Sequence, residues 1–252
     1  MPKLGCASIN KLFNVDQDKI LRDPENIRLF QAMTRFAKLL QRLGYPVQIY
    51  SESSLQKIEQ ISAEDKMRLV SDFETWSEWV EPLNPLTPTE NQMHLLKRAL
   101  AKHGFEAHDE FLKTIEPDQI VEFYNEDMIQ LYRSFNFFKI SGYSLLDMSV
   151  FEWYLLWDRP RQIMKSISAE LSDSLKTYIP VKRFATPRHV IREIYDTRNS
   201  KPFIPRTALA EFLHLGSLRT NKFTRNLKKG FICTSYGQLL AVGEESKTID
   251  FI

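Results

Sequence analysis

The sequence predicts an α+β protein in three parts. These are a helical N-terminal region over residues 1–117, a central antiparallel sheet with flanking helices over 118–184, and a small basic α+β C-terminal module over 185–252. Three observations support this division: apolar residues at helical spacing in the first part, a dense group of aromatic residues in the second, and an excess of basic residues in the third. A chain of 252 residues is long enough for one large domain or two to three small ones.

Helix-start signals are clear in the first part. Asp23 followed by Pro24 predicts an N-cap and a first helical residue, and Ser62 with Asp65 predicts a second helix start of the capping-box type. Three prolines make residues 81–88 the best linker candidate. We interpret the apolar stripes of these helices as core or as a dimer seam, because such stripes at helical spacing ordinarily pack against other apolar surfaces.

The stretch from Gln119 to Pro160 contains eleven aromatic residues among 42, whereas 12% of the whole chain is aromatic. Aromatic side chains bring large apolar areas that are costly to leave in water, so these must be buried or must line a pocket. The sequence alone does not distinguish a ligand pocket from a solid core. The residues that we assign to this pocket or core are Phe123, Tyr132, Phe137, Phe138, Tyr143, Trp153 and Trp157.

Residues 134–160 resemble the first half of a PAS domain. Family members often read Asn-Pro-Ala-Phe-x-x-Leu-Thr-Gly-Tyr-Ser-x-Glu-Glu-Leu, then a helical stretch and a Pro-x-Asp-Arg turn. Ser134 departs from the family's leading Asn. The matching positions are Phe137, Ile140-Ser141, the identical Gly142-Tyr143-Ser144, Leu146-Asp147-Met148 and Asp158-Arg159. The local chemistry agrees with the resemblance, because Ser144 can cap a helix whose third residue, Asp147, completes a capping box.

The resemblance implies a sensory module over about residues 118–185. It also implies an opening strand, which residues 119–124 can supply, then helices, then three long antiparallel strands. Residues 164–176 read as helix, and after them only residues 178–184 look like a strand. A plain aromatic helical core is the alternative interpretation.

Charge is distributed unevenly along the chain, although the net charge is only +2. Residues 1–181 hold 21 basic and 26 acidic side chains, whereas residues 182–230 hold 12 basic and 3 acidic ones. Such a block is typical of a surface that binds phosphates, and the simpler interpretation is a solvated basic face.

Residues 205–243 resemble a winged helix-turn-helix in their pattern. We expect a first helix from Thr207 to Leu213, a turn at His214-Leu215-Gly216, a recognition helix from Ser217 or Thr220 to Gly230, and a hairpin wing around Tyr236-Gly237. Arg and Asn side chains on such a helix read base edges, and Lys side chains meet phosphates. The candidate nucleic-acid-binding residues are Arg219, Asn221, Lys222, Arg225, Asn226, Lys228 and Lys229.

Motifs of enzymes and cofactor sites are not found. The sequence contains no Gly-x-Ser-x-Gly, no phosphate loop and no dinucleotide-binding glycine pattern, and its two cysteines and five histidines form no metal-ligand spacing. We therefore expect no catalytic residues, no metal and no cofactor. The lack of a long apolar run and of a secretory signal predicts a cytoplasmic protein without membrane contact.

Together these observations predict a one-component regulator, in which the PAS-like module senses a signal or partner and the basic module binds DNA. The expected partners are DNA and a second copy of the chain, with a small-molecule ligand left open. The alternative is a non-enzymatic interaction or scaffold subunit that dimerises through the PAS-like module and docks an acidic partner.

Overall fold

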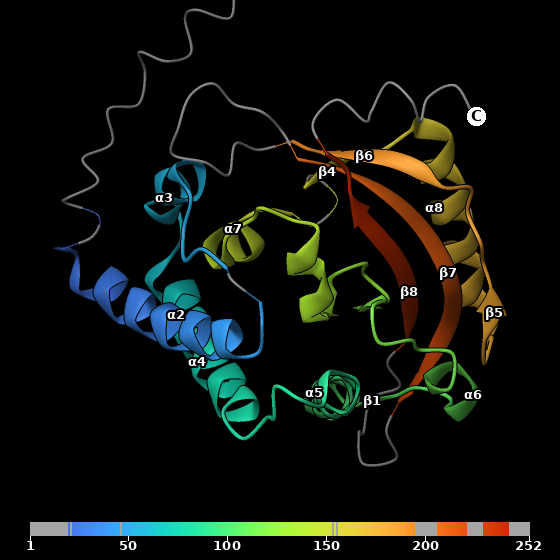
Figure 1. Ribbon diagram of the computed structural model, residues 1–252, viewed down its shortest axis with the longest axis horizontal. Helices are drawn as coiled ribbons and strands as arrows, with labels where there is room; N and C mark the ends of the chain where they lie inside the picture. The colour runs from blue at the N-terminus through green and yellow to red at the C-terminus, as the bar shows by residue number, and fades with distance from the viewer. Residues whose placement is uncertain are drawn as a thin grey trace, which may run out of the picture.

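The computed structural model describes residues 20, 22–45, 47–152, 154, 156–194, 206–220 and 229–241, and the following account concerns these residues. Its α+β class is confirmed: helices α2 to α5 gather at one side of the molecule, and a curled antiparallel sheet with α6 and α8 beside it lies at the other (Figure 1). A segment with two short helices lies between these two groups.

The N-terminal helices begin and end where the sequence signals them. Helix α2 starts behind Asp23, whose carboxylate accepts hydrogen bonds from the backbone N–H groups of Glu25 and Asn26. Helix α4 starts behind Ser62, and helix α5 ends at Gly104, whose φ of 75° is the left-handed conformation common after a helix C-terminus. The helix bounds are Pro24–Arg42 for α2, Glu52–Ile58 for α3, Ala63–Val80 for α4, Pro88–His103 for α5 and Asp109–Leu112 for α6.

The strands form one sheet in the order β3-β2-β8-β7-β6-β4, and every pairing in it is antiparallel. Strands β1 and β5 pair with β7 outside this path. The bounds are Phe105–Glu106 for β1, Ile120–Asn125 for β2, Gln130–Arg133 for β3, Trp157–Asp158 for β4, Lys182–Arg183 for β5, His189–Glu193 for β6, Thr207–Thr220 for β7 and Gly230–Leu239 for β8. Between β3 and β6 the chain forms the 3-10 helix η2 (Phe135–Lys139), helix α7 (Leu145–Val150) and helix α8 (Arg161–Lys176).

The expected winged-helix pattern is wrong over the described part of residues 205–243. The segment expected as a first helix and a turn is the strand β7, and the expected wing hairpin is a single strand, β8, that continues through Tyr236 and Gly237. Gly216 does not form a turn: a Cβ atom there would lie 2.8 Å from the Phe111 ring and 2.9 Å from the Pro180 carbonyl oxygen, so glycine allows two segments to approach the strand closely. Residues 221–228, which contain most of the expected recognition helix, lie outside the described residues.

Pairing on both edges explains why β7 is a strand in spite of helix-forming residues such as Ala208, Leu209 and Glu211. It pairs with β6 on one edge and with β8 on the other, and tertiary pairing of this kind overrides local preference. Strand β8 pairs in turn with β2, so the C-terminal segment completes the central sheet. The predicted boundary between residues 184 and 185 therefore lies within one sheet.

Alternating residues of β2 define two faces of the sheet. Val121 and Phe123 face helices α2 to α6, and they share one apolar core with residues of these helices; we call this side the helical-region face. Glu122 and Tyr124 face the opposite side, where Tyr124 packs in a second core with α8; we call this side the α8 face. Both faces of the sheet are covered. The apolar core on the helical-region face contains residues from both sides of the predicted division between residues 117 and 118, so this division runs through one core.

A hydrogen-bonded joint connects the N-terminal helices to the segment between β3 and β6. Ser144 and Asp147 form the expected capping box of α7, and the buried Asp147 carboxylate also accepts a hydrogen bond of 2.5 Å from the hydroxyl of Ser51, the N-cap of α3. The backbone N–H groups of Leu145 and Leu146 donate to carbonyl groups at positions 48 and 49. The polar groups at the N-termini of α3 and α7, which lie far apart in the sequence, are thus hydrogen-bonded in one network.

Candidate ligand-binding cavity

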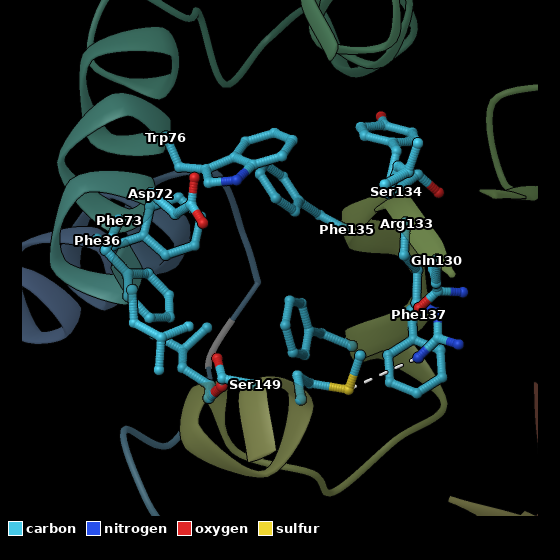
Figure 2. A pocket seen from close by; sticks show the side chains of 16 residues that line it. Phe36, Asp72, Phe73, Trp76, Gln130, Arg133, Ser134, Phe135, Phe137 and Ser149 are labelled. Atoms are coloured by element: carbon cyan, nitrogen blue, oxygen red, sulfur yellow. Dashed lines mark hydrogen bonds between the residues drawn. The ribbon is translucent and has the colours of Figure 1, made fainter. Parts of the chain in front are cut away.

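A cavity of about 310 Å³ lies where the N-terminal helices meet the edge strand β3, η2 and α7. Figure 2 shows Phe36, Phe73 and Trp76 on one side of it and Phe135, Arg133 and Phe137 on the other. The lining residues are Phe36, Leu69, Asp72, Phe73, Trp76, Gln130, Leu131, Tyr132, Arg133, Ser134, Phe135, Phe137, Phe138, Leu145, Met148 and Ser149.

Seven of the sixteen lining residues are aromatic, and their rings are held by contacts with one another. The Tyr132 ring stacks on Phe123 at a centroid distance of 5.5 Å and on Trp76 at 5.9 Å. Phe36 contacts Phe73 and Phe135 edge-on or at a tilt, at 5.7 and 5.8 Å. Such contacts fix ring orientation, so this wall is preorganised for a flat or apolar molecule.

Polar side chains lie at two sides of the cavity. On the β3 side, the Arg133 guanidinium lies 4.1 Å from the Phe137 ring centroid, and its Nε donates to the Glu122 carboxylate at 2.5 Å. Its Nη1 makes a weak contact of 3.6 Å with the Met148 sulfur, the dashed line in Figure 2. On the α4 side, Asp72 accepts a hydrogen bond of 2.7 Å from Lys102. Charged groups are therefore present, but each is already engaged.

Burial widens the pH range over which the Tyr132 phenol is neutral. Burial raises the pKa of Tyr132 well above its ordinary value, and the nearby phenol of Tyr45 raises it further. A phenol is already uncharged at neutral pH, and this shift keeps Tyr132 uncharged at more alkaline pH as well.

The predicted pocket residues separate into two groups. Tyr132, Phe137 and Phe138 line the cavity. Phe123, Tyr143 and Trp157 are packed in the cores instead; the Tyr143 hydroxyl, for example, donates to the Leu156 carbonyl. Trp153 lies outside the described residues.

Sequence reasoning missed the half of the cavity that comes from α2 and α4. Phe36, Phe73 and Trp76 lie on apolar helical stripes, and the sequence predicts that such stripes form core or a dimer seam. Their spacing shows only that each helix has a buried side. Nothing in the spacing indicates that this side meets the aromatic stretch.

Only two of the predicted nucleic-acid-binding residues are described. Arg219 is exposed near the end of β7, where its guanidinium lies 4.3 Å from the Tyr178 ring centroid, and Lys229 is exposed just before β8. Asn221, Lys222, Arg225, Asn226 and Lys228 lie outside the described residues.

Within the described part of the chain, no group of three or more His, Cys, Asp or Glu side chains is arranged to hold a metal ion. No helix among the same residues is long and apolar enough to cross a bilayer. Comparison of the chain with protein-family models, curated proteins and solved structures found no match.

Proposed function

We propose that this protein is a sensory regulator that binds a small, largely apolar molecule in the aromatic cavity. The observation that carries the proposal is the cavity itself, since about 310 Å³ is within the range of small-molecule sites and seven of its lining residues are aromatic. Its charged groups lie at the sides and are already paired within the protein, so the cavity would hold a ligand mainly by apolar contact. The class of protein is thus a ligand-binding sensor of α+β fold.

The order of elements supports a PAS-like interpretation of the sheet. The resemblance calls for an opening strand, then helices, then three antiparallel strands. Apart from the two-residue strands β4 and β5, which flank α8, the chain runs β2, β3, then η2, α7 and α8, then β6, β7 and β8. The capping box at Ser144 and Asp147 lies at the position of the family-like motif. Two of the three later strands, β7 and β8, lie in the segment that the sequence pattern assigned to a winged helix, and β6 lies before that segment.

A ligand in this cavity would touch two groups of elements at once. Trp76 and Phe36 belong to the N-terminal helices, whereas Tyr132 and Phe137 belong to the sheet side. A molecule that fits one arrangement of these groups better than another shifts the population between them, and a differential affinity of about 1–3 kcal/mol is enough for regulation. We propose this shift as the signal.

A cavity-filling substitution tests the sensor proposal. N-phenyl-1-naphthylamine, a neutral dye that fluoresces in apolar sites, should bind the wild-type protein saturably. Leu69→Trp, which fills the cavity from α4, should weaken this binding about tenfold or more. Met67→Trp is the matched control, because Met67 is 64% exposed on the same helix and does not line the cavity. Absence of saturable binding to wild type, or equal binding to the Leu69 variant, would overturn the proposal.

We further propose DNA as the output partner, because the segment from Arg219 to Lys229 contains five basic and no acidic side chains. This segment joins β7 to β8, and β8 pairs with β2, the neighbour of the cavity strand β3. Fluorescence anisotropy with duplex DNA at two salt concentrations should show binding that weakens with salt, and Arg225→Ala should reduce it.

Binding that does not change with salt, or no binding at low salt, would refute the DNA proposal. In that case the scaffold alternative would gain support if the protein is a dimer by mass in solution and retains a binding partner in a pull-down.

A further inference from the structure

Two donor nitrogens of the Arg159 guanidinium, Nε and Nη1, are buried and unused, whereas the residue as a whole is half-buried. Arg159 lies directly before α8, and its Nε and Nη1 atoms are shielded from solvent and have no hydrogen-bond partner among the described residues. A buried arginine is ordinarily paired, because removing a charge and its N–H groups from water is costly unless other groups replace the water. Within the described chain, the Nε and Nη1 donors of Arg159 therefore lack the partners that their burial calls for.

The carboxylate that acts most strongly on Arg159 among the described residues is already hydrogen-bonded to other side chains. Glu122, on the α8 face, accepts from Arg133 Nε at 2.5 Å and from Gln130 Nε2 at 3.0 Å. It attracts Arg159 only at longer range, with no hydrogen bond between the two side chains. Glu122 thus balances one arginine, and a second positive charge remains.

The other ionisable groups around Arg159 do not supply the missing negative charge. Burial raises the pKa of the Tyr124 hydroxyl and of the Cys233 thiol well above their ordinary values, so both are neutral at pH 7. Burial lowers the pKa of His189, and Arg159 lowers it further, so this ring is neutral as well. Among the described residues, Arg159 and the ionisable groups that act on it therefore sum to two arginines against one carboxylate.

Two further buried groups in the same part of the sheet also lack partners. Trp157, two positions before Arg159, has an Nε1–H group without an acceptor among the described residues. His189 Nδ1 lies 3.0 Å from the Pro187 carbonyl, which can only accept, so Nδ1 carries the proton and the unpartnered Nε2 presents a lone pair. Donors therefore outnumber acceptors at this place, which suits an anionic guest.

We propose that Arg159 binds the carboxylate of a small organic acid within the α8 face of the sheet, with the Trp157 indole N–H as an additional donor. A carboxylate fits for two reasons. Its single charge cancels the single excess positive charge, whereas a phosphate dianion would leave a buried negative charge. Its two oxygens also match the forked donors of a guanidinium.

This site is separate from the aromatic cavity, because neither Arg159 nor Trp157 lines that cavity. The inference therefore goes beyond the proposed sensor function, and the two can fail independently. Leu69→Trp should leave the binding of carboxylates unchanged, and Arg159→Met should leave the binding of the neutral dye unchanged.

Thermal unfolding in the presence of sodium acetate or sodium benzoate tests the site. Sodium chloride at equal ionic strength is the reference, and sodium phosphate represents the alternative class of anion. We expect at least one carboxylate to raise the Tm of the wild-type protein saturably, by about 4 °C or more at saturation. Arg159→Met, which retains a long apolar side chain but no charge, should abolish this rise. Arg161→Met is the matched control, since Arg161 is exposed on the first turn of α8 and should not matter.

If Arg159→Met does not fold, Arg159→Lys replaces it: it keeps the charge but loses the fork, and it should weaken carboxylate binding about tenfold or more. The proposal is overturned if neither carboxylate stabilises the wild-type protein. It is also overturned if the Arg159 variant is stabilised as much as the wild-type protein and the Arg161 control. Stabilisation by phosphate alone would overturn the assignment to carboxylates.

Discussion

The two faces of the sheet are both buried, yet they are built from different chemistry. On the helical-region face, β2 presents Val121 and Phe123, and the packing there is apolar. On the α8 face the same strand presents Glu122 and Tyr124, which belong to a buried polar network with Arg133. Stability on the first face comes from shape and apolar area, whereas on the second it depends on hydrogen bonds and charge balance.

The largest effect should come from Phe123→Ala on the helical-region face. Phe123 is fully buried between Tyr132, Phe105 and His103, so its removal leaves a cavity in a packed core. We expect a loss of about 3–5 kcal/mol in the free energy of unfolding, measured by urea denaturation. Ile129→Ala, at a side chain that is 56% exposed, serves as control and should change it by less than about 1 kcal/mol. A small loss at Phe123 would mean that this face is not tightly packed.

Glu122→Gln tests the opposite face. The substitution keeps the shape of the side chain but leaves the Arg133 and Arg159 charges without a carboxylate, so we expect a loss of about 3 kcal/mol. Glu126→Gln, at an exposed position just beyond the same strand, is the matched control. A loss no larger than that of the control would show that charge balance does not matter on this face, and the contrast between the faces would disappear.

Ser51→Ala should have a smaller effect, at the joint between the helices and α7. It removes both the N-cap of α3 and the hydrogen bond to Asp147, so we expect a loss of about 1–2 kcal/mol. Ser62→Ala removes an exposed N-cap without such a cross-link and should cost less. Equal losses in urea denaturation would show that the joint adds nothing to the cap.

The smallest effect should be a pH dependence from His189. Its pKa is lowered below the ordinary 6.5 because burial disfavours the charged ring. The unfolded chain therefore binds the proton more readily, and stability that is present above pH 6.5 is lost as the pH falls towards the lowered pKa. The slope from this group cannot exceed about 1.4 kcal/mol per pH unit. Denaturation at pH 7.5 and 5.5 should show this loss in wild type and a smaller one in His189→Gln; equal losses would contradict it.

Local signals predicted the helices well, because caps act over a few residues. Asp23, Ser62 and Ser144 each begin a helix where expected, and the predicted helix over residues 164–176 lies within α8. Residues 119–124 form most of β2 as expected. These predictions needed no knowledge of distant parts of the chain.

Distant pairing was not predictable by the same means. Strand β7 lacks polar and apolar alternation because it is central and both of its faces are partly or fully buried, so its Ala and Leu residues resembled a helix. Arg159 was recognised only as part of a family-like turn, and its sequence gives no sign of burial. The cavity likewise depends on α2 and α4 meeting β3, which involves residues about 60 to 100 positions apart.

The pairing of β2 with β8 has a consequence for how the chain folds. Ile120 pairs with Ser235, 115 positions later, so β2 cannot gain its second neighbour until almost all of the described chain has been synthesised. Contacts of such long sequence separation slow folding, and until they form, β2 and β7 each expose an unpaired edge that can join another chain. Fragments that end before Gly230 should therefore aggregate even though their helices can form, and expression in truncated form should be far less successful than expression of the whole chain.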